Sequence, residues 1–245
     1  MHRRIAERIA DAAGLSKNDT VLEIGPGTGM LTRALLERAK NVVAVEADGE
    51  LVTELRETFA SEIADGSLTL VHDDIRTFDP SVLKTYLLVA NIPYYITGEI
   101  IRMFLSAQAK PSSMTLLVQK EVAERIARSK KESLLSLSVK VYGTPRYQFT
   151  VPRGAFRPAP NVDSAVLTIS DIQSGFASLK EEKTFFEVLR AGFAHKRKLL
   201  AGNLGVLAPS ERVASALREA GIPEKARSED VPLLGWRSLA RALST

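Results

Sequence analysis

The sequence contains no cysteine among its 245 residues. Disulfide bonds, cysteine-ligated zinc and thiol catalysis are therefore excluded, and a cytoplasmic setting is expected. Histidine is also scarce: the three residues His2, His72 and His195 lie far apart in the chain, so no metal site is expected.

Long apolar runs are missing as well. No stretch approaches the roughly 20 apolar residues that a membrane-spanning helix needs. The charged residues 1–8 lack the apolar core of a signal peptide, so no membrane association is expected. The formal net charge is +4, from 33 Lys and Arg against 29 Asp and Glu. This excess suits a polyanionic partner, but a slightly basic soluble enzyme fits equally well.

Short apolar segments alternate with helical patterns through the first two-thirds of the chain. Five such segments are 21–24, 42–45, 68–71, 87–90 and 114–118. Each is too short for a helix, whereas residues 31–39 and 50–63 have helical periodicity. Repeated strand-helix-strand units predict an α/β fold with a doubly wound, mostly parallel sheet and helices on both faces.

The pattern changes near residue 170. The segment 171–175 has the composition of a linker, and only helical patterns follow it, at 181–193, 209–220 and 234–243. We therefore predict two domains, an α/β domain over 1–170 and a small helical C-terminal domain over 171–245.

A glycine loop follows the first predicted strand. Gly25, Gly27 and Gly29 have the spacing G-x-G-x-G, and glycine lets the backbone approach a ligand closely. Dinucleotide sites instead have G-x-G-x-x-G, with a pyrophosphate at the helix N-terminus. The spacing favours S-adenosylmethionine, which has no phosphate, and a nicotinamide-dependent dehydrogenase is disfavoured.

Acidic residues end the next two predicted strands. Glu46 could accept hydrogen bonds from both ribose hydroxyls of the cofactor, and Asp74 one from its adenine amine, with the Ile75 backbone beside the ring. A tight turn with surface acids is the alternative interpretation. Placement of all three features at successive strand ends favours cofactor binding.

The fourth predicted strand leads into Asn91-Ile92-Pro93-Tyr94. An adenine amine is a poor nucleophile because its lone pair is delocalised into the ring. The Asn91 side-chain oxygen and the Ile92 carbonyl could accept both amine hydrogens, Pro93 would keep the turn rigid, and Tyr94 could stack on the flipped-out base. Methyl transfer to such an amine needs positioning and electrostatics more than a strong base.

A second aromatic side chain, Phe156, lies in a loop rich in proline and glycine. It could form the other wall of a base pocket, and it could equally fill the core. Arg153 and Arg157 beside it could contact phosphate groups or remain solvated.

Together these motifs resemble one family, the small-subunit ribosomal RNA adenine N6,N6-dimethyltransferases of the KsgA type. The resembling segments are 21–29, 91–94, 119–123 and 151–167. The resemblance implies a Rossmann-like class I methyltransferase with S-adenosylmethionine bound at Gly25, Glu46, Asp74 and Asn91. It also implies that Asn91 and Tyr94 hold the target adenine and that Phe156 stacks on it.

The same resemblance implies a substrate and a partner. The family dimethylates two adjacent adenosines near the 3′ end of small-subunit rRNA during ribosome biogenesis. Its helical C-terminal domain is thought to help bind the immature small subunit. The basic segment 193–198 fits that role, although a solvated helix end is the simpler explanation. A monomer is expected.

Two alternatives remain open at this stage. One is a large-subunit rRNA adenine N6-methyltransferase that confers antibiotic resistance, disfavoured by residues 133–143 and 156–165. The other is a non-catalytic RNA-binding factor of ribosome assembly, disfavoured because Asn91 and the glycines are present. Family members usually carry a further N-terminal segment before the first helix, so we expect this chain to bind the cofactor more weakly than a version with that segment restored.

Overall fold

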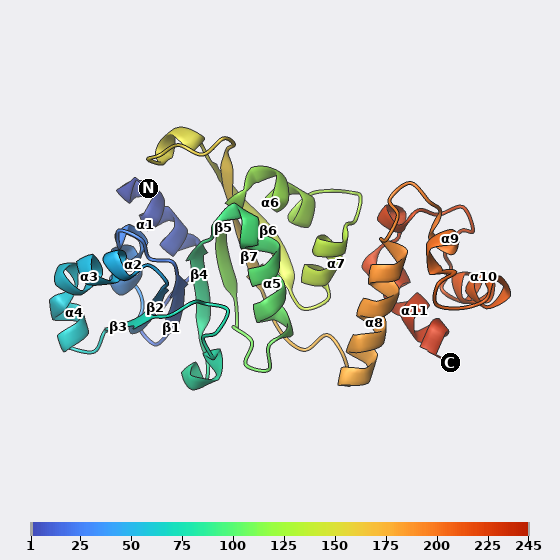
Figure 1. The fold of residues 1–245 in the computed structure, drawn as a ribbon, viewed down its shortest axis with the longest axis horizontal. Helices are drawn as coiled ribbons and strands as arrows, with labels where there is room; N and C mark the ends of the chain where they lie inside the picture. Colours follow the sequence, from blue (N-terminus) through green and yellow to red (C-terminus); the bar gives the residue numbers. More distant parts are fainter. Residues whose placement is uncertain (1, 245) are drawn as a thin grey trace. The chain divides into compact units, whose positions relative to one another are not determined.

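The computed structural model describes residues 2–244, which fold into two compact units. The first unit comprises the chain up to Glu124 together with Thr144–Gln173. The second comprises Arg125–Gly143 together with the chain from Ser174 onward. Figure 1 shows the order of their elements along the chain.

The first unit is built on a seven-stranded sheet with the order β3-β2-β1-β4-β5-β7-β6. Its strands are β1 (Thr20–Ile24), β2 (Asn41–Glu46), β3 (Leu68–His72), β4 (Leu87–Asn91), β5 (Met114–Gln119), β6 (Thr144–Val151) and β7 (Ser164–Ser170). β1 to β5 are parallel, whereas β7 is antiparallel to both β5 and β6. The predicted α/β fold with a mostly parallel sheet is confirmed.

Helices cover this sheet. They are α1 (Arg3–Ala12), α2 (Met30–Leu36), α3 (Gly49–Thr58), α4 (Ala60–Ala64), α5 (Thr97–Ser106) and the start of α6 (Lys120–Ala127), with short 3-10 turns at Pro80–Leu83, Tyr94–Ile96 and Arg153–Ala155. Apolar residues of α1, α2 and α3 form one cluster with Val89 of β4. Since side chains alternate along a strand, Leu88 and Ala90 point to the other face, where they are also buried. Figure 1 shows α5 beside β5.

The single helix predicted over 50–63 is wrong: two helices, α3 and α4, are separated at Phe59. Phe59 leaves the helical conformation, with φ −116° and ψ 30°, and its ring is completely buried. A Cβ added to Gly29 would lie 2.3 Å from Cε2 of this ring. The ring therefore packs directly against the glycine loop, and its burial outweighs helical continuity.

The second unit is helical. Its elements are α7 (Leu134–Lys140), α8 (Leu179–Gly192), α9 (Leu200–Leu204), α10 (Ser210–Glu219), a 3-10 turn (Ser228–Asp230) and α11 (Leu233–Ser244). Phe193 stacks on the buried Trp236 with ring centroids 5.3 Å apart. No helix within residues 2–244 has the length and apolar character needed to cross a membrane.

The predicted domain boundary at residue 170 needs a correction, because residues 125–143 belong to the helical unit. The reason is aromatic packing. The Tyr142 ring lies 5.8 Å from that of Phe176 and 6.0 Å from that of Phe186, and its hydroxyl donates a hydrogen bond to Glu182. A single boundary along the sequence cannot describe this arrangement, because residues 125–143 lie between two segments of the first unit but pack in the second.

Candidate active site

The carboxyl ends of the parallel strands bring the predicted cofactor residues to one edge of the first unit. The strand order reverses between β1 and β4, where Ile24 pairs in register with Ala90. The residues that follow this pair, Gly25 and Asn91, are therefore neighbours. Ligands of open parallel sheets bind at such a reversal, outside the carboxyl ends of the strands.

The glycine loop adopts a conformation that side-chain-bearing residues rarely take. Gly25, Gly27 and Gly29 have φ values of 64°, 58° and 74°. Three left-handed residues within five positions fold the chain sharply between β1 and α2. The backbone is thereby exposed to a ligand along the loop.

Glu46, at the end of β2, holds this loop in place. Its Oε2 accepts a hydrogen bond from the Gly27 amide at 3.1 Å. Its Oε1 accepts two more, from Ala47 at 3.0 Å and Asp48 at 3.1 Å. The side chain is nearly buried, with 8% of its residue surface exposed. Oε2 retains acceptor capacity for another donor.

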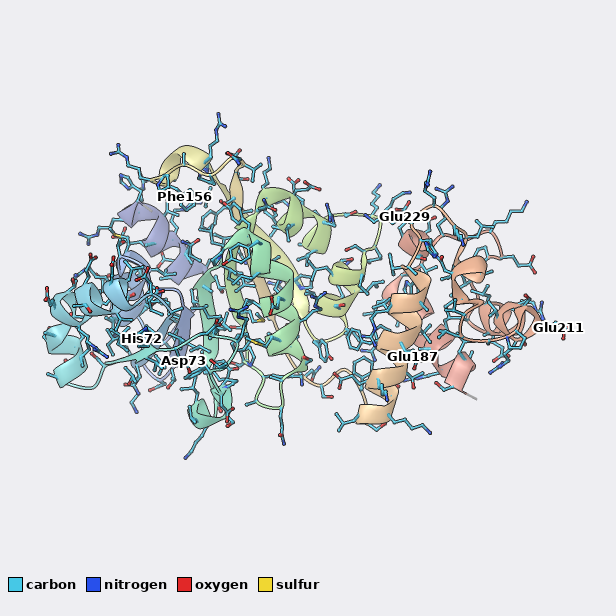
Figure 2. All side chains as sticks on the ribbon, viewed as in Figure 1. His72, Asp73, Phe156, Glu187, Glu211 and Glu229 are labelled. Carbon is cyan, nitrogen blue, oxygen red and sulfur yellow. The ribbon has the colours of Figure 1, made fainter. Side chains whose placement is uncertain are left out.

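The end of β3 is joined to the same edge, because the Asp73 amide donates to the Glu46 carbonyl at 3.0 Å. Figure 2 labels His72 and Asp73 there. Asp74 follows, and the Arg76 guanidinium contacts its carboxylate at 2.5 Å. The Arg76 hydrogen bonds lower the pKa of Asp74 to about 2. This partner of Asp74 was not predicted from the sequence.

Asn91 ends β4 and is half-buried. Its side-chain amide has no hydrogen-bond partner among residues 2–244. Ile92 is buried, with 1% of its surface exposed, whereas Pro93 is exposed. The Tyr94 hydroxyl shares a hydrogen bond of 2.6 Å with Ser164 Oγ, which fixes the half-buried ring. The tetrapeptide thus joins β4 to the start of β7.

The Phe156 loop is fastened by Asp163. Its Oδ1 accepts a hydrogen bond from the Arg153 amide at 2.9 Å, and its carbonyl accepts one from Lys120 at 3.0 Å. Phe156 is half-buried and packs against the cluster that contains α1, and Figure 2 labels it on the segment after β6. Arg153 and Arg157 are exposed and form no ion pair within the described residues.

Glu23 is a residue that sequence analysis missed. It lies on β1, with 1% of its surface exposed, and neither carboxyl oxygen has a hydrogen-bond partner in the described part of the chain. Burial raises its pKa to about 8, and Glu46 adds to the shift. The nearby Thr32 hydroxyl opposes the shift but makes no hydrogen bond of ordinary geometry. The sequence feature that could have identified Glu23 is a single acidic residue within an otherwise apolar strand.

Solved structures of methyltransferases have the same fold as this chain. The 23S rRNA methyltransferase ErmE is 28% identical, with a TM-score of 0.80 over 100% of this chain and 99% of that one. A dimethyladenosine transferase from Plasmodium falciparum is also 28% identical, with a TM-score of 0.83 over 96% of this chain and 94% of that one.

The family model described as ribosomal RNA adenine dimethylase matches residues 1–244. The chain belongs to the ribosomal RNA adenine dimethylase family, as the sequence motifs predicted. A small-subunit rRNA methyltransferase A from Dehalococcoides mccartyi is 41% identical over 242 residues, covering 96% of this chain and 82% of the relative. The protein of that name from Fusobacterium nucleatum is 38% identical over 238 residues, covering 94% and 88%.

Proposed function

We propose that this protein uses S-adenosylmethionine to dimethylate N6 of two adjacent adenosines near the 3′ end of small-subunit rRNA. The observation that carries the proposal is the Asn91 amide, half-buried and without a partner beside the glycine loop. The small-subunit substrate follows the names of the relatives at 41% and 38% identity.

The residues at this edge fit the cofactor. The site offers a left-handed glycine loop, the Glu46 carboxylate with spare acceptor capacity, and the buried Glu23 carboxyl without a partner. These groups suit a ligand that carries hydroxyls and positive charge. The residues that would hold it are Gly25, Gly27, Glu46, Asp74, Ile75 and Asn91. When bound, S-adenosylmethionine supplies the methyl group from its sulfonium.

The protein's part in the reaction is positioning. The Asn91 oxygen and the Ile92 carbonyl accept the two hydrogens of the target amine, which turns its lone pair out of conjugation with the ring. Pro93 limits the backbone, and the Tyr94 ring, fixed through Ser164, stacks on the base. The methylated nitrogen carries an extra proton, which is acidic enough to leave to water without a protein base.

The Phe156 loop would complete the base site. Phe156 packs partly on the core, so its exposed part is the surface offered to the adenine. Arg153 and Arg157 are exposed and unpaired among the described residues, and this suits contact with RNA phosphates.

A basic loop in the second unit would bind the RNA outside the active site. Lys196, Arg197 and Lys198 are all exposed in the turn after α8. The Asn203 amide fixes this turn by donating to the Gly192 carbonyl at 2.6 Å and the His195 carbonyl at 3.1 Å. A fixed turn with three adjacent cations can bind a phosphate backbone with little loss of entropy.

The proposed function is tested by incubating the protein with labelled S-adenosylmethionine and unmethylated small or large subunits, and then mapping the label. We expect N6,N6-dimethyladenosine at two adjacent positions near the 3′ end of small-subunit rRNA. The second candidate function is that of a large-subunit rRNA adenine N6-methyltransferase, which is supported by the TM-score of 0.80 to a 23S rRNA methyltransferase. Label on the large subunit alone would establish that function instead. Binding without any label would indicate a non-catalytic assembly factor.

The basic loop is tested by a double variant, Lys196→Gln with Arg197→Gln. Its matched control, Lys180→Gln with Lys183→Gln, removes two cations from α8 that are also exposed. Each lost phosphate contact should lower the slope of log affinity against log salt by about 0.7 to 0.9. We expect the loop variant to bind RNA more weakly with a shallower slope, measured by filter binding from low to moderate salt. Equal slopes for both double variants would remove the loop from the RNA interface.

A further inference from the structure

Tyr95 is the most exposed of the large apolar and aromatic side chains identified on the described surface, with 88% of its surface in solvent. A single exposed apolar residue is ordinary and by itself indicates nothing. The position of Tyr95 is unusual, however, because it directly follows the tetrapeptide that ends in Tyr94.

The two neighbouring tyrosines have different surroundings. Tyr94 is half-buried and bonded to Ser164. Successive side chains of a 3-10 turn point about 120° apart, so Tyr95 leaves the site that Tyr94 enters. Its ring has no aromatic, cation-π or hydrogen-bonding partner among residues 2–244.

The backbone beneath Tyr95 is fixed although its ring is free. The Ile96 amide donates to the Pro93 carbonyl at 3.2 Å, and the buried Thr97, which begins α5, donates to the same carbonyl at 3.5 Å. A ring on a fixed backbone with an open face loses little freedom when a flat ligand stacks on it.

Arg76 interacts electrostatically with Tyr95 and Glu99, but its guanidinium is already bonded to the Asp74 carboxylate. It therefore offers little free positive charge to a phosphate. The part of a nucleotide that Tyr95 matches is the base, whose flat face can stack on an open aromatic ring.

We propose that Tyr95 is a stacking platform for the nucleobase adjacent to the adenosine in the Asn91 site. This inference rests on the proposed function. A base that enters the site leaves its neighbour unstacked, and Tyr95 is one residue away from the ring that would hold the entering base. With two adjacent targets, the platform would hold one adenosine while the other is methylated. Stacking is tolerant of sequence, so Tyr95 contributes to RNA affinity and to completion of the second modification.

The test uses the full chain and a short RNA with 2-aminopurine next to one target adenosine. The variants are Tyr95→Ala, Tyr95→Trp and the control Val82→Ala. Val82 is 69% exposed and lies before the amino end of β4, away from the carboxyl edge. Fluorescence of the bound RNA reports stacking without requiring catalysis, and steady-state kinetics give KM and kcat separately.

We expect Tyr95→Ala to brighten the bound 2-aminopurine and to raise the KM for RNA by about 10-fold, since aromatic stacking commonly contributes this much per base. Affinity for S-adenosylmethionine should not change, Tyr95→Trp should restore quenching, and Val82→Ala should resemble the unmodified protein. Unchanged fluorescence and KM in Tyr95→Ala would overturn the inference. So would a self-associated protein that Tyr95→Ala converts to monomers, measured by sedimentation. Tyr95-dependent quenching without methylation would support the platform and contradict only the proposed function.

Discussion

The two units of the chain differ in how they use buried polar side chains. At the carboxyl edge of the sheet, the Glu23 carboxyl has no partner and the half-buried Asn91 amide also stands free among the described residues. In the helical unit, the Asn203 amide and the Ser228 hydroxyl both donate to the Gly192 carbonyl.

We infer from this difference that the polar groups at the sheet edge serve a ligand, whereas those in the helical unit serve the fold. An unsatisfied buried group costs stability, and sites that tolerate it are often functional. The Asn203 amide nitrogen is bonded within the fold and offers little to a ligand, although Asn203 Oδ1 and Trp236 Nε1 have no partner within residues 2–244. Substitutions should therefore remove activity at the sheet edge and stability in the helical unit.

The largest effect is expected for Asn91→Ala. Without the amide oxygen, the target amine has one acceptor fewer, and loss of one such preorganised group commonly lowers kcat by about 100-fold or more. The folded state loses no hydrogen bond, so the urea midpoint should move little. Methylation assays and urea unfolding measure the two effects. Normal activity in this variant would end the proposed mechanism, and a large loss of stability would break the contrast between the units.

Asn203→Ala should show the opposite behaviour. It removes both donors from the turn after α8 and leaves the Gly192 and His195 carbonyls with fewer partners, at a cost of about 2 kcal/mol. Asn203→Asp keeps the shape but cannot donate, so it should destabilise the protein at least as much. Thermal unfolding should begin at lower temperature in both variants, with cofactor affinity unchanged. If Asn203→Asp is as stable as the original, the donated hydrogen bonds are not what fixes this turn.

Much of the fold follows from local sequence. The predicted segments 21–24, 42–45 and 87–90 all lie inside strands, because an apolar run bounded by turn residues has few alternatives in a parallel sheet. The break at Phe59 and the assignment of residues 125–143 to the helical unit depend on where aromatic rings pack. That information lies in contacts between distant residues, which periodicity does not contain.

The candidate site also contains residues that the sequence could predict and residues that it could not. Glu46 and Asn91 could be placed at one edge because they follow strands, and parallel strands end together. Glu23 could not be assigned, since its environment depends on how α2 covers β1. The Arg76 contact with Asp74 spans only two residues, so the sequence did contain it as a nearby pair of opposite charges.

Glu23→Gln tests the comparison through the pH dependence of the protein's stability. The pKa of Glu23 is raised from an ordinary value near 4.5 to about 8 by burial. Between these values the unfolded carboxyl is ionised and the folded one is protonated. Stability should therefore fall as pH rises, by up to roughly 1.4 kcal/mol per pH unit from this group. The neutral amide of the variant should remove that slope, measured by urea unfolding at pH 5.5 and 7.5.

Addition of S-adenosylmethionine gives the matching control for Glu23. A cationic ligand at this edge favours the ionised carboxyl, so it should flatten the slope in the original protein and leave Glu23→Gln unaffected. The same pH dependence in both proteins, with and without the cofactor, would mean that Glu23 is not the buried acid that titrates.

The smallest effect is expected at Asp74, whose carboxylate already has a partner in Arg76. An exposed ion pair contributes little, and the Arg76 amide would still donate to Asp74 Oδ1 at 2.9 Å if the guanidinium were removed. Arg76→Ala should therefore free the carboxylate for the cofactor without displacing it, and tighten S-adenosylmethionine binding by about 2- to 3-fold in calorimetry. Arg76→Lys keeps the charge but loses the two-pronged contact, so its affinity should fall between the two. Weaker binding by Arg76→Ala would show that the guanidinium positions Asp74 rather than competing for it, and that this edge of the sheet relies on satisfied polar groups as the helical unit does.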